Sequence, residues 1–259
     1  MFKKILLLFL LMTMISTGCK VKENKHDLYQ SIIEKDNLTV GISYDSKPFG
    51  FKDSDGKIKG IEPDIAREIA RRMLGSDKKL TFKHVAPRDR IPAVTSGEVD
   101  MVISAMTITP QRKKIVEFSN PYFIAGQAIC VKKASEIDSY HDLNNKNVIV
   151  ILGTTGETNL RGLVPNAIMQ GYVNNADAFD AFKKGENDAI TTDDSLLLGL
   201  AMEHNDYKIL PERLSKEPYG IAFKKSKDAS SLKKNINKIL DDIKLSGKLD
   251  SIKEKWIVY

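Results

Sequence analysis

Apolar and polar positions along the chain follow two alternating periods, one typical of buried strands and one typical of amphipathic helices. The apolar run 38–42 predicts a strand. Segment 62–74 places its apolar side chains on one helical face, and Gly75 suits the position that follows a helix. The same alternation predicts strands at 80–85 and 99–104, with a short helix at 91–96 between them.

A second series of strands and helices begins near residue 147. Strands are expected at 147–152, 168–172 and 188–192, and helices from Thr155 or Gly156, at 176–184 and at 195–202. A long amphipathic helix at 231–245 and a further helix up to Trp256 close the chain. Two strand–helix series of similar length predict an α/β fold with two lobes.

Two extended apolar segments, 127–131 and 219–223, flank the second series and are suited to cross between lobes. We therefore expect residues 37–126 and 224–259 in lobe 1, and residues 127–223, hinge strands included, in lobe 2. In α/β sheets, ligands bind beyond the carboxyl ends of strands, and in two-lobed proteins they bind in the cleft.

The N-terminus reads as an export signal. Lys3 and Lys4 precede a short apolar run, and small residues lead to Cys19, so residues 1–18 are expected to be cleaved. This resembles a bacterial lipoprotein signal with lipid attached to Cys19, although Ser16 stands where such signals usually carry Leu. The alternative is a secretory peptide cut elsewhere. Segment 19–36 is polar and without periodicity, which predicts a flexible tether.

Composition narrows the function. An apolar share of 42% supports a core, and loss of Lys3 and Lys4 lowers the formal charge from +6 to +4. Charges of both signs are interspersed, which argues against nucleic acid. Cys130 lies in an apolar run and is expected to be a buried, inert thiol. The four histidines are not spaced as metal ligands, so no metal or cofactor is expected.

A polar turn with an arginine follows the strand at 99–104. Ser104 is followed by Thr107, Thr109 and Arg112. A planar guanidinium binds a carboxylate through two hydrogen bonds, and free N–H groups and hydroxyls at a strand end complete a site for a small anion or zwitterion. The alternative is an ordinary strand–turn–helix junction.

Short pieces spread over residues 37–256 together resemble the solute-binding proteins of polar amino-acid ABC transporters. The resemblance implies the two-lobed type II fold of periplasmic binding proteins, with two hinge strands and the ligand enclosed between the lobes. The pieces, in the family's order, are Lys47-Pro-Phe-Gly-Phe51, Gly60-Ile-Glu-Pro-Asp-Ile65, Arg90-Ile-Pro-Ala-Val94, Gly97-Glu-Val-Asp100, Thr107-Ile-Thr-Pro-Gln-Arg112, Phe118-Ser-Asn-Pro-Tyr-Phe123, Gly153-Thr-Thr155 and Tyr219-Gly-Ile-Ala-Phe223.

The resemblance also implies roles in binding. Arg112 would hold the ligand α-carboxylate, helped by the N–H groups of Thr107 and Thr155, the latter at a helix start. Asp193, the Ser104 carbonyl and the Thr107 hydroxyl would receive the α-ammonium. Asp193 could alternatively be only a helix cap, and Thr155 only a first-turn residue. Ala105 and Thr154 complete the expected site.

Selectivity is read from two positions. Ser46 stands where several relatives carry an aromatic cover, so Tyr44 or Phe49 would supply the ring. Arg90 would pair with a carboxylate on the ligand side chain, which favours glutamate or aspartate. Alternatively Arg90 faces solvent, beside Arg88, and the ligand is glutamine, cystine or cysteine.

The expected function is capture of a polar amino acid outside the cytoplasm and its delivery to the transmembrane subunits of an ABC importer. We expect no catalysis, a monomer, and attachment to the outer face of the membrane through the N-terminal lipid. The rival is an enzyme resembling cyclohexadienyl dehydratase, with Glu157 or Glu62 as the general acid. A ligand sensor acting through a partner protein is a further alternative.

Overall fold

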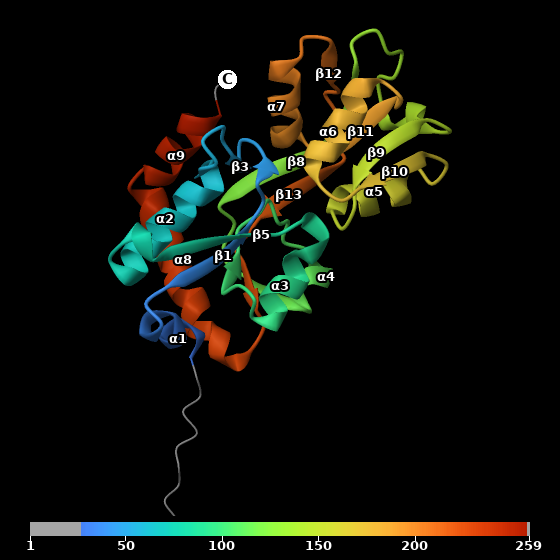
Figure 1. Cartoon of the computed structure of the whole chain (residues 1–259). Helices are drawn as coiled ribbons and strands as arrows, with labels where there is room; N and C mark the ends of the chain where they lie inside the picture. Colours follow the sequence, from blue (N-terminus) through green and yellow to red (C-terminus); the bar gives the residue numbers. More distant parts are fainter. Residues whose placement is uncertain (1–26, 258–259) are drawn as a thin grey trace, which may run out of the picture.

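The computed structural model describes residues 27–257, apart from the side chains of residues 202, 203 and 227. The described chain forms two α/β lobes, with lobe 1 at the lower left of Figure 1 and lobe 2 at the upper right. The two-lobed α/β prediction is confirmed. The expected signal peptide, Cys19 and the first part of the expected tether lie outside the described residues, so these remain predictions.

Lobe 1 is built on a five-stranded sheet in the order β5-β1-β6-β14-β7. β1 runs parallel to β5 and β6, whereas β14, which comes late in the chain, runs antiparallel to β6 and β7. The chain therefore leaves lobe 1 after β7 and returns to it at β14. The strands are β1 (Leu38–Ile42), β5 (Leu80–His84), β6 (Met101–Val102), β7 (Val116–Phe118) and β14 (Ala222–Lys224).

Helices cover this sheet and bury apolar side chains against it. The buried residues of the long helices recur at helical spacing, as Ile65, Ile69 and Met73 do in α2. The α-helices are α1 (Leu28–Glu34), α2 (Ile61–Leu74), α3 (Arg90–Ser96), α4 (Pro110–Lys113), α8 (Ser230–Leu245) and α9 (Lys248–Trp256). Short 3-10 turns are η1 (Asp77–Lys79), η2 (Pro87–Asp89) and η4 (Lys227–Ala229).

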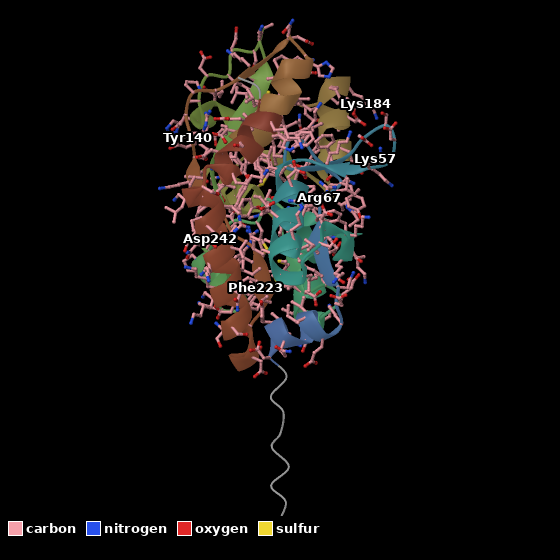
Figure 2. All side chains as sticks on the ribbon, turned by 90° about the vertical axis from the view of Figure 1, so that its left-hand side faces the viewer. Lys57, Arg67, Tyr140, Lys184, Phe223 and Asp242 are labelled. Atoms are coloured by element: carbon pink, nitrogen blue, oxygen red, sulfur yellow. The ribbon has the colours of Figure 1, made fainter. Side chains whose placement is uncertain are left out.

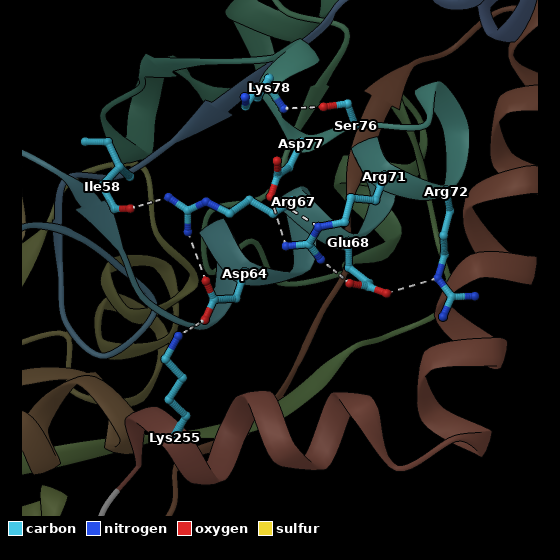
Figure 3. Close-up of polar contacts among 10 residues, drawn as sticks. All are labelled: Ile58, Asp64, Arg67, Glu68, Arg71, Arg72, Ser76, Asp77, Lys78 and Lys255. Atoms are coloured by element: carbon cyan, nitrogen blue, oxygen red, sulfur yellow. Dashed lines mark hydrogen bonds and ion pairs between the residues drawn. The ribbon is translucent and has the colours of Figure 1, made fainter.

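The start of α2 requires a glycine. Gly60 precedes the helix with φ of 126°, and a Cβ there would lie 2.1 Å from the carbonyl oxygen of Phe49. The outer face of α2 carries charged side chains between Asp64 and Arg72, which Figure 3 shows with their partners from neighbouring segments. Lys255 and the indole N–H of Trp256 both reach Asp64, at 2.8 and 2.9 Å, so α9 is tied to α2. The Lys255 side chain is exposed, so this ion pair contributes little to stability.

A small antiparallel sheet, β2-β3-β4, extends from lobe 1 toward lobe 2. Its strands are β2 (Asp45–Ser46), β3 (Gly50–Lys52) and β4 (Ile58–Lys59). Phe49, between β2 and β3, is fully buried, and its ring lies 4.9 Å from that of Phe123 and 5.3 Å from that of Tyr219. The small sheet is thus anchored to aromatic side chains beside the junction of the lobes.

Lobe 2 contains a six-stranded sheet in the order β10-β9-β11-β8-β12, with β13 also paired to β8. β9, β10 and β11 are parallel, and β8 is antiparallel to its neighbours. The strands are β8 (Phe123–Lys132), β9 (Asn147–Ile151), β10 (Ile168–Tyr172), β11 (Ala189–Asp193), β12 (Tyr207–Ile209) and β13 (Ser215–Tyr219). The helices are η3 (Tyr140–Leu143), α5 (Thr155–Leu163), α6 (Asn175–Lys184) and α7 (Asp194–Glu203).

Both faces of the lobe 2 sheet are buried. Val148 and Val150 of β9 pack with Leu160 of α5, whereas Ile149 and Ile151 pack on the other face, with α6 and α7. This alternation explains the continuous apolar run at 147–151, because neighbouring residues of a strand point to opposite faces. In the side view of Figure 2, Phe223 of β14 lies inside lobe 1, where it is fully buried.

The two passages between the lobes run side by side. The first is residues 119–122, between β7 and β8, and the second is residues 220–221, between β13 and β14. Backbone N–H groups of Ser119 and Tyr122 donate to the carbonyls of Ile221 and Tyr219, at 2.9 and 3.0 Å. A pair of crossings tied in this way allows the lobes to turn about one axis.

The first passage falls earlier in the chain than the expected hinge strand at 127–131. Those residues pair with β11 inside the lobe 2 sheet, whereas residues 123–127 pair with β13. β8 is a single strand of ten residues whose partners change midway. A continuous apolar run does not reveal such a change, so the expected boundary at 126/127 is shifted to about 122/123.

The expected tether 19–36 is wrong for its second half, because residues 28–34 form α1. The carboxylate of Asp27 accepts a hydrogen bond from the N–H of Tyr29 and starts the helix. Ile32 is buried, and α1 packs against α8. A helix of seven residues shows too little periodicity to be recognised among charged neighbours.

Candidate ligand-binding site

A cavity of about 20 Å³ lies between the lobes. It is found beyond the carboxyl ends of strands of both lobes, as expected for α/β sheets. Room for about one water molecule remains, so a molecule the size of an amino acid enters only when the lobes separate. Its lining residues are Arg90, Ala105, Thr107 and Arg112 from lobe 1, and Thr154, Thr155, Gly156, Asn175, Thr192, Asp193 and Leu196 from lobe 2.

Arg112 joins the two lobes. Its position is set by α4, where the hydroxyl of Thr109 accepts the N–H of Arg112 at 3.1 Å. Its Nη1 donates to the carbonyl of Thr107 at 2.9 Å, and its Nη2 donates to the carbonyl of Gly153 in lobe 2 at 3.1 Å. Burial, followed by repulsion from Arg90, lowers the pKa of Arg112 to about 10, so the guanidinium is charged at neutral pH.

Opposite Arg112, the N-terminus of α5 enters the cavity. Thr154 caps the helix by accepting the N–H of Glu157 at 3.3 Å, and the hydroxyl of Thr155 lies 3.4 Å from that of Thr107 across the cleft. Gln127 fixes the helix by donating to the carbonyl of Gly156 at 3.1 Å. First-turn N–H groups lack acceptors within the helix and favour an anion, so this end suits a carboxylate.

Asp193 supplies a buried carboxylate at the end of β11. It is 8% exposed and lines the cavity, and it accepts a hydrogen bond from the hydroxyl of Tyr219. Its side chain makes no cap bond to α7, whereas Asp194 accepts the N–H of Ser195 at 2.7 Å. Burial raises the pKa of Asp193 to about 7. A ligand ammonium would restore the charged form of this carboxylate.

Ala105 forms the lobe 1 wall with an unusual backbone. Its φ of 40° is left-handed, a conformation that costs a non-glycine residue energy and is found at functional sites. Its N–H donates to Glu62 at 2.5 Å and its carbonyl accepts from Arg90 at 3.2 Å, which explains how the conformation is held. Ser104 is buried behind it, its hydroxyl 2.9 Å from that of Ser43, and it does not line the cavity.

Arg90 and Glu62 are buried side chains of opposite charge that both bond to the backbone of Ala105. Arg90 is 5% exposed and Glu62 is fully buried, held also by the hydroxyl of Tyr122 at 2.5 Å. Burial lowers the pKa of Arg90 and raises that of Glu62, and their mutual attraction opposes both shifts. Within residues 27–257, Arg90 Nε and Glu62 Oε2 have no hydrogen-bond partner. The alternative in which Arg90 faces solvent is therefore excluded.

Neither expected aromatic cover lines the cavity. Phe49 is part of the core, as described above, because the apolar end of the β2–β3 turn packs against the junction of the lobes. Tyr44 is half-buried, its hydroxyl donates to the carbonyl of Phe82 at 3.3 Å, and its ring lies beside His84. These two residues, predicted from the sequence as ligand contacts, are not brought to the site in this structure.

Sequence reasoning missed four residues that line the cavity, namely Gly156, Asn175, Thr192 and Leu196. Thr192 directly precedes Asp193 on β11, so its position near the end of a strand was the one feature of the sequence that could have indicated it. Asn175 is the first residue of α6 and lies 130 residues from its partner Asp45. Such a contact depends on how the lobes meet, and a pattern within one element does not predict it.

Two α/β lobes that join through paired passages and close over an arginine and an aspartate define a two-lobed binding protein of the type II fold. The chain belongs to the bacterial extracellular solute-binding proteins, family 3, whose family model matches residues 38–259. The family and the fold predicted from the sequence are confirmed.

Three comparisons place the chain within this family. It is 41% identical to the ABC transporter glutamine-binding protein GlnH of Bacillus subtilis (strain 168), over 93% of this chain and 89% of the relative. It is 43% identical to a glutamine-binding protein of Geobacillus stearothermophilus, over 74% of each chain. Among solved structures, an ancestral arginine-binding protein bound to glutamine matches with a TM-score of 0.80 and 43% identity, over 85% of this chain and 97% of that one.

Two further observations concern residues 27–257. No helix in this range is long and apolar enough to cross a membrane. Likewise, no three His, Cys, Asp or Glu side chains within it are grouped so that they could hold a metal ion.

Proposed function

We propose that the protein captures a polar α-amino acid, with glutamine as the preferred ligand, and delivers it to an ABC importer. Family membership supports transport, and the names of the two relatives support glutamine. The sequence had favoured glutamate or aspartate on the strength of Arg90 alone.

The α-groups of the ligand would be held from both lobes. The α-carboxylate would replace the carbonyl groups now bound to Arg112 and would also receive N–H groups at the start of α5. The α-ammonium would bind the carboxylate of Asp193. Because the ligand would contact both lobes only when they are closed, its binding would shift the population toward the closed form.

The proposal that the ligand side chain is uncharged rests on the balance of charge around the cavity. Two arginines, the buried Arg90 and the partly buried Arg112, are accompanied by three buried carboxylates, on Glu62, Asp193 and Glu217. These groups interact electrostatically. Among the neighbouring charges, Glu62 attracts Arg90 most strongly, and Glu217 attracts Arg112 most strongly. A site without excess positive charge favours a zwitterion with an uncharged side chain over an anionic amino acid.

Glutamate is the second candidate. The free Nε of Arg90 is a buried donor without a partner in residues 27–257, and burying an unpaired donor costs free energy. A side-chain carboxylate would satisfy it, as would the carbonyl oxygen of a carboxamide. Glutamine and glutamate are equal in length, so the polar and charged groups around the side chain, Arg90 and Glu62 among them, would discriminate between them.

Capture without catalysis is the proposed role. The carboxylates considered for a dehydratase do not line the cavity. Glu157 accepts the N–H of Gly153 at 3.0 Å and pairs with Arg161, and Glu62 lies behind Ala105. A general acid must reach the reacting atoms directly or through one water molecule, and neither carboxylate is arranged to do so.

The oligomeric state, the lipid anchor and the location are part of the same proposal. The mature protein would be a monomer, attached through lipid on Cys19 to the outer face of the membrane, where the transmembrane subunits of the importer would receive the ligand. Membership of an extracellular family supports export.

The test is calorimetric titration of residues 20–259, the mature chain from Lys20 without the lipid-bearing Cys19, after unfolding and refolding to remove bound ligand. Glutamine, glutamate, aspartate, arginine, cysteine and cystine would be titrated separately. We expect glutamine to bind most tightly. Tighter binding of glutamate would replace the ligand and retain the transport role, whereas prephenate turnover without amino-acid binding would overturn both.

A further inference from the structure

Asn175 lines the cavity and is not among the residues proposed to hold the α-groups of the ligand. It is the first residue of α6, it is 3% exposed, and it lines the cavity. Arg90 lines the same cavity from lobe 1. The two side chains therefore reach the binding site from opposite lobes.

Lobe 1 holds the backbone of Asn175. Within lobe 2, Asn174 caps α6 by accepting the N–H of Asp177 at 2.8 Å. The N–H groups of Asn175 and Ala176 are instead accepted by the carboxylate of Asp45 on β2, at 2.8 and 3.2 Å. A carboxylate at a helix N-terminus is favourable, so this contact orients the start of α6 when the lobes are closed.

Lobe 1 also sets the side chain of Asn175. Its Nδ2 donates to the hydroxyl of Ser46 at 2.9 Å, and both residues are buried. An amide has donors only on nitrogen and acceptors only on oxygen. One N–H of this nitrogen is bound to Ser46, so the amide offers a ligand its second N–H and its carbonyl oxygen Oδ1, and only Oδ1 requires a donor from the ligand.

Arg90 has the opposite property, because a guanidinium only donates. A carboxamide placed between them meets both needs, with its oxygen on Arg90 and its NH₂ on Asn175. A carboxylate would satisfy Arg90 but has no donor for Oδ1 of Asn175, so that oxygen would be left without a hydrogen bond in the complex. Discrimination between glutamine and glutamate thus depends on a polar group that would lack a hydrogen-bond partner in the glutamate complex.

We propose that Asn175 is a specificity-determining residue that selects a carboxamide side chain, and that Ser46 orients its amide from the opposite lobe. This inference rests on the proposed function and deepens it. The lobes must close before Asn175 takes this place, so selection and closure occur together.

The test measures the affinities of the mature chain from Lys20 for glutamine and for glutamate by calorimetry, with glutamate tested to high concentration. Asn175→Ala should weaken glutamine binding about tenfold and change glutamate binding by less than about twofold. Ser46→Ala should act in the same direction with a smaller effect, because the amide then loses its orientation. Asp45→Ala is the matched control, since it should weaken both ligands by the same factor.

Each of the following results would overturn the inference. If Asn175→Ala weakens both ligands equally, as Asp45→Ala does, Asn175 is only a closure contact and the inference is overturned. Unchanged binding in Asn175→Ala also overturns it, while the proposed function stands. If the unaltered chain binds no glutamine, the proposed function fails and this inference fails with it. Thermal unfolding without ligand verifies that each variant is folded.

Discussion

The hydroxyl of Tyr219 donates a hydrogen bond to Asp193, so a residue beside the second passage between the lobes holds the carboxylate at the end of β11. The backbone of Tyr219 also forms a β-bridge with Thr107, and its ring stacks on Phe123. The junction of the lobes and the proposed ammonium site therefore share one fully buried side chain.

Ligand affinity should depend on pH through Asp193. Burial raises the pKa of Asp193 to about 7, and an ammonium binds the charged carboxylate. Affinity for glutamine should therefore fall as pH is lowered below about 7, approaching tenfold per pH unit. Tyr219→Phe removes a donor that stabilises the charged form, so the midpoint should move to higher pH. Calorimetry between pH 5 and about 8.5 measures both.

The same group affects the stability of the ligand-free protein with a defined sign. The pKa of an aspartate carboxyl is 3.8 ordinarily and about 7 here, so the folded state binds more protons between these values. The contribution of Asp193 to stability is present at low pH and is lost as pH rises through this window. The outcome that contradicts the affinity prediction is also defined. If the affinity for glutamine does not change with pH, either in the unaltered protein or in Tyr219→Phe, Asp193 is not the ammonium site.

Glu62→Gln should increase the preference for glutamate relative to glutamine. Glu62 is the leading attraction on Arg90, and its removal leaves the guanidinium available to a ligand carboxylate. The ratio of the two affinities should change by about tenfold. Glu68→Gln is the matched control, because it changes the charge of α2 by the same amount at its outer face. Equal ratios in the two variants would show that Glu62 does not set the charge of the site.

Phe49→Ala should destabilise the fold by about 3–5 kcal/mol, since it leaves a cavity among the rings of Phe123 and Tyr219. Urea unfolding followed by circular dichroism measures the change. Phe51→Ala, at a half-buried ring on β3 that contacts Trp256, should cost clearly less. If the two variants cost the same, Phe49 is not the anchor of the small sheet.

Cys130 should be unreactive in the folded protein. It is fully buried in the lobe 2 core, and burial raises the pKa of its thiol to about 12. In the mature chain from Lys20 it is the only cysteine. A thiol reagent such as Ellman's reagent should label it only after the addition of denaturant. Rapid labelling of the native chain at neutral pH would contradict the buried position.

Much of the fold was accessible from the sequence because its elements have clear periods. The apolar face of α2 and the apolar run at β9 predict their structures and nearly their limits. α1 was missed because it is short, and the first passage was misplaced because β8 is one continuous strand that changes partners. These features depend on contacts with distant segments.

The site divides in the same way. Arg112, Thr107, Thr155 and Asp193 stand in motifs at strand or helix ends, and the structure brings them together around the cavity. Glu62 and Asn175 gained their importance only in three dimensions. The first bonds to the backbone of Ala105 and attracts the charge of Arg90, and the second is held by β2 of the other lobe. Charge balance and contacts between lobes are properties of the assembled site.

The most direct test of the account is a titration of glutamine into the mature chain and into Arg112→Ala, with Arg88→Ala as the control for loss of an exposed arginine charge nearby. We expect saturable binding of one ligand per chain, about a hundredfold or more weaker in Arg112→Ala and unchanged in Arg88→Ala. Equal affinity in the Arg112→Ala variant would contradict the account, because the ligand would then bind without the residue that joins the two lobes.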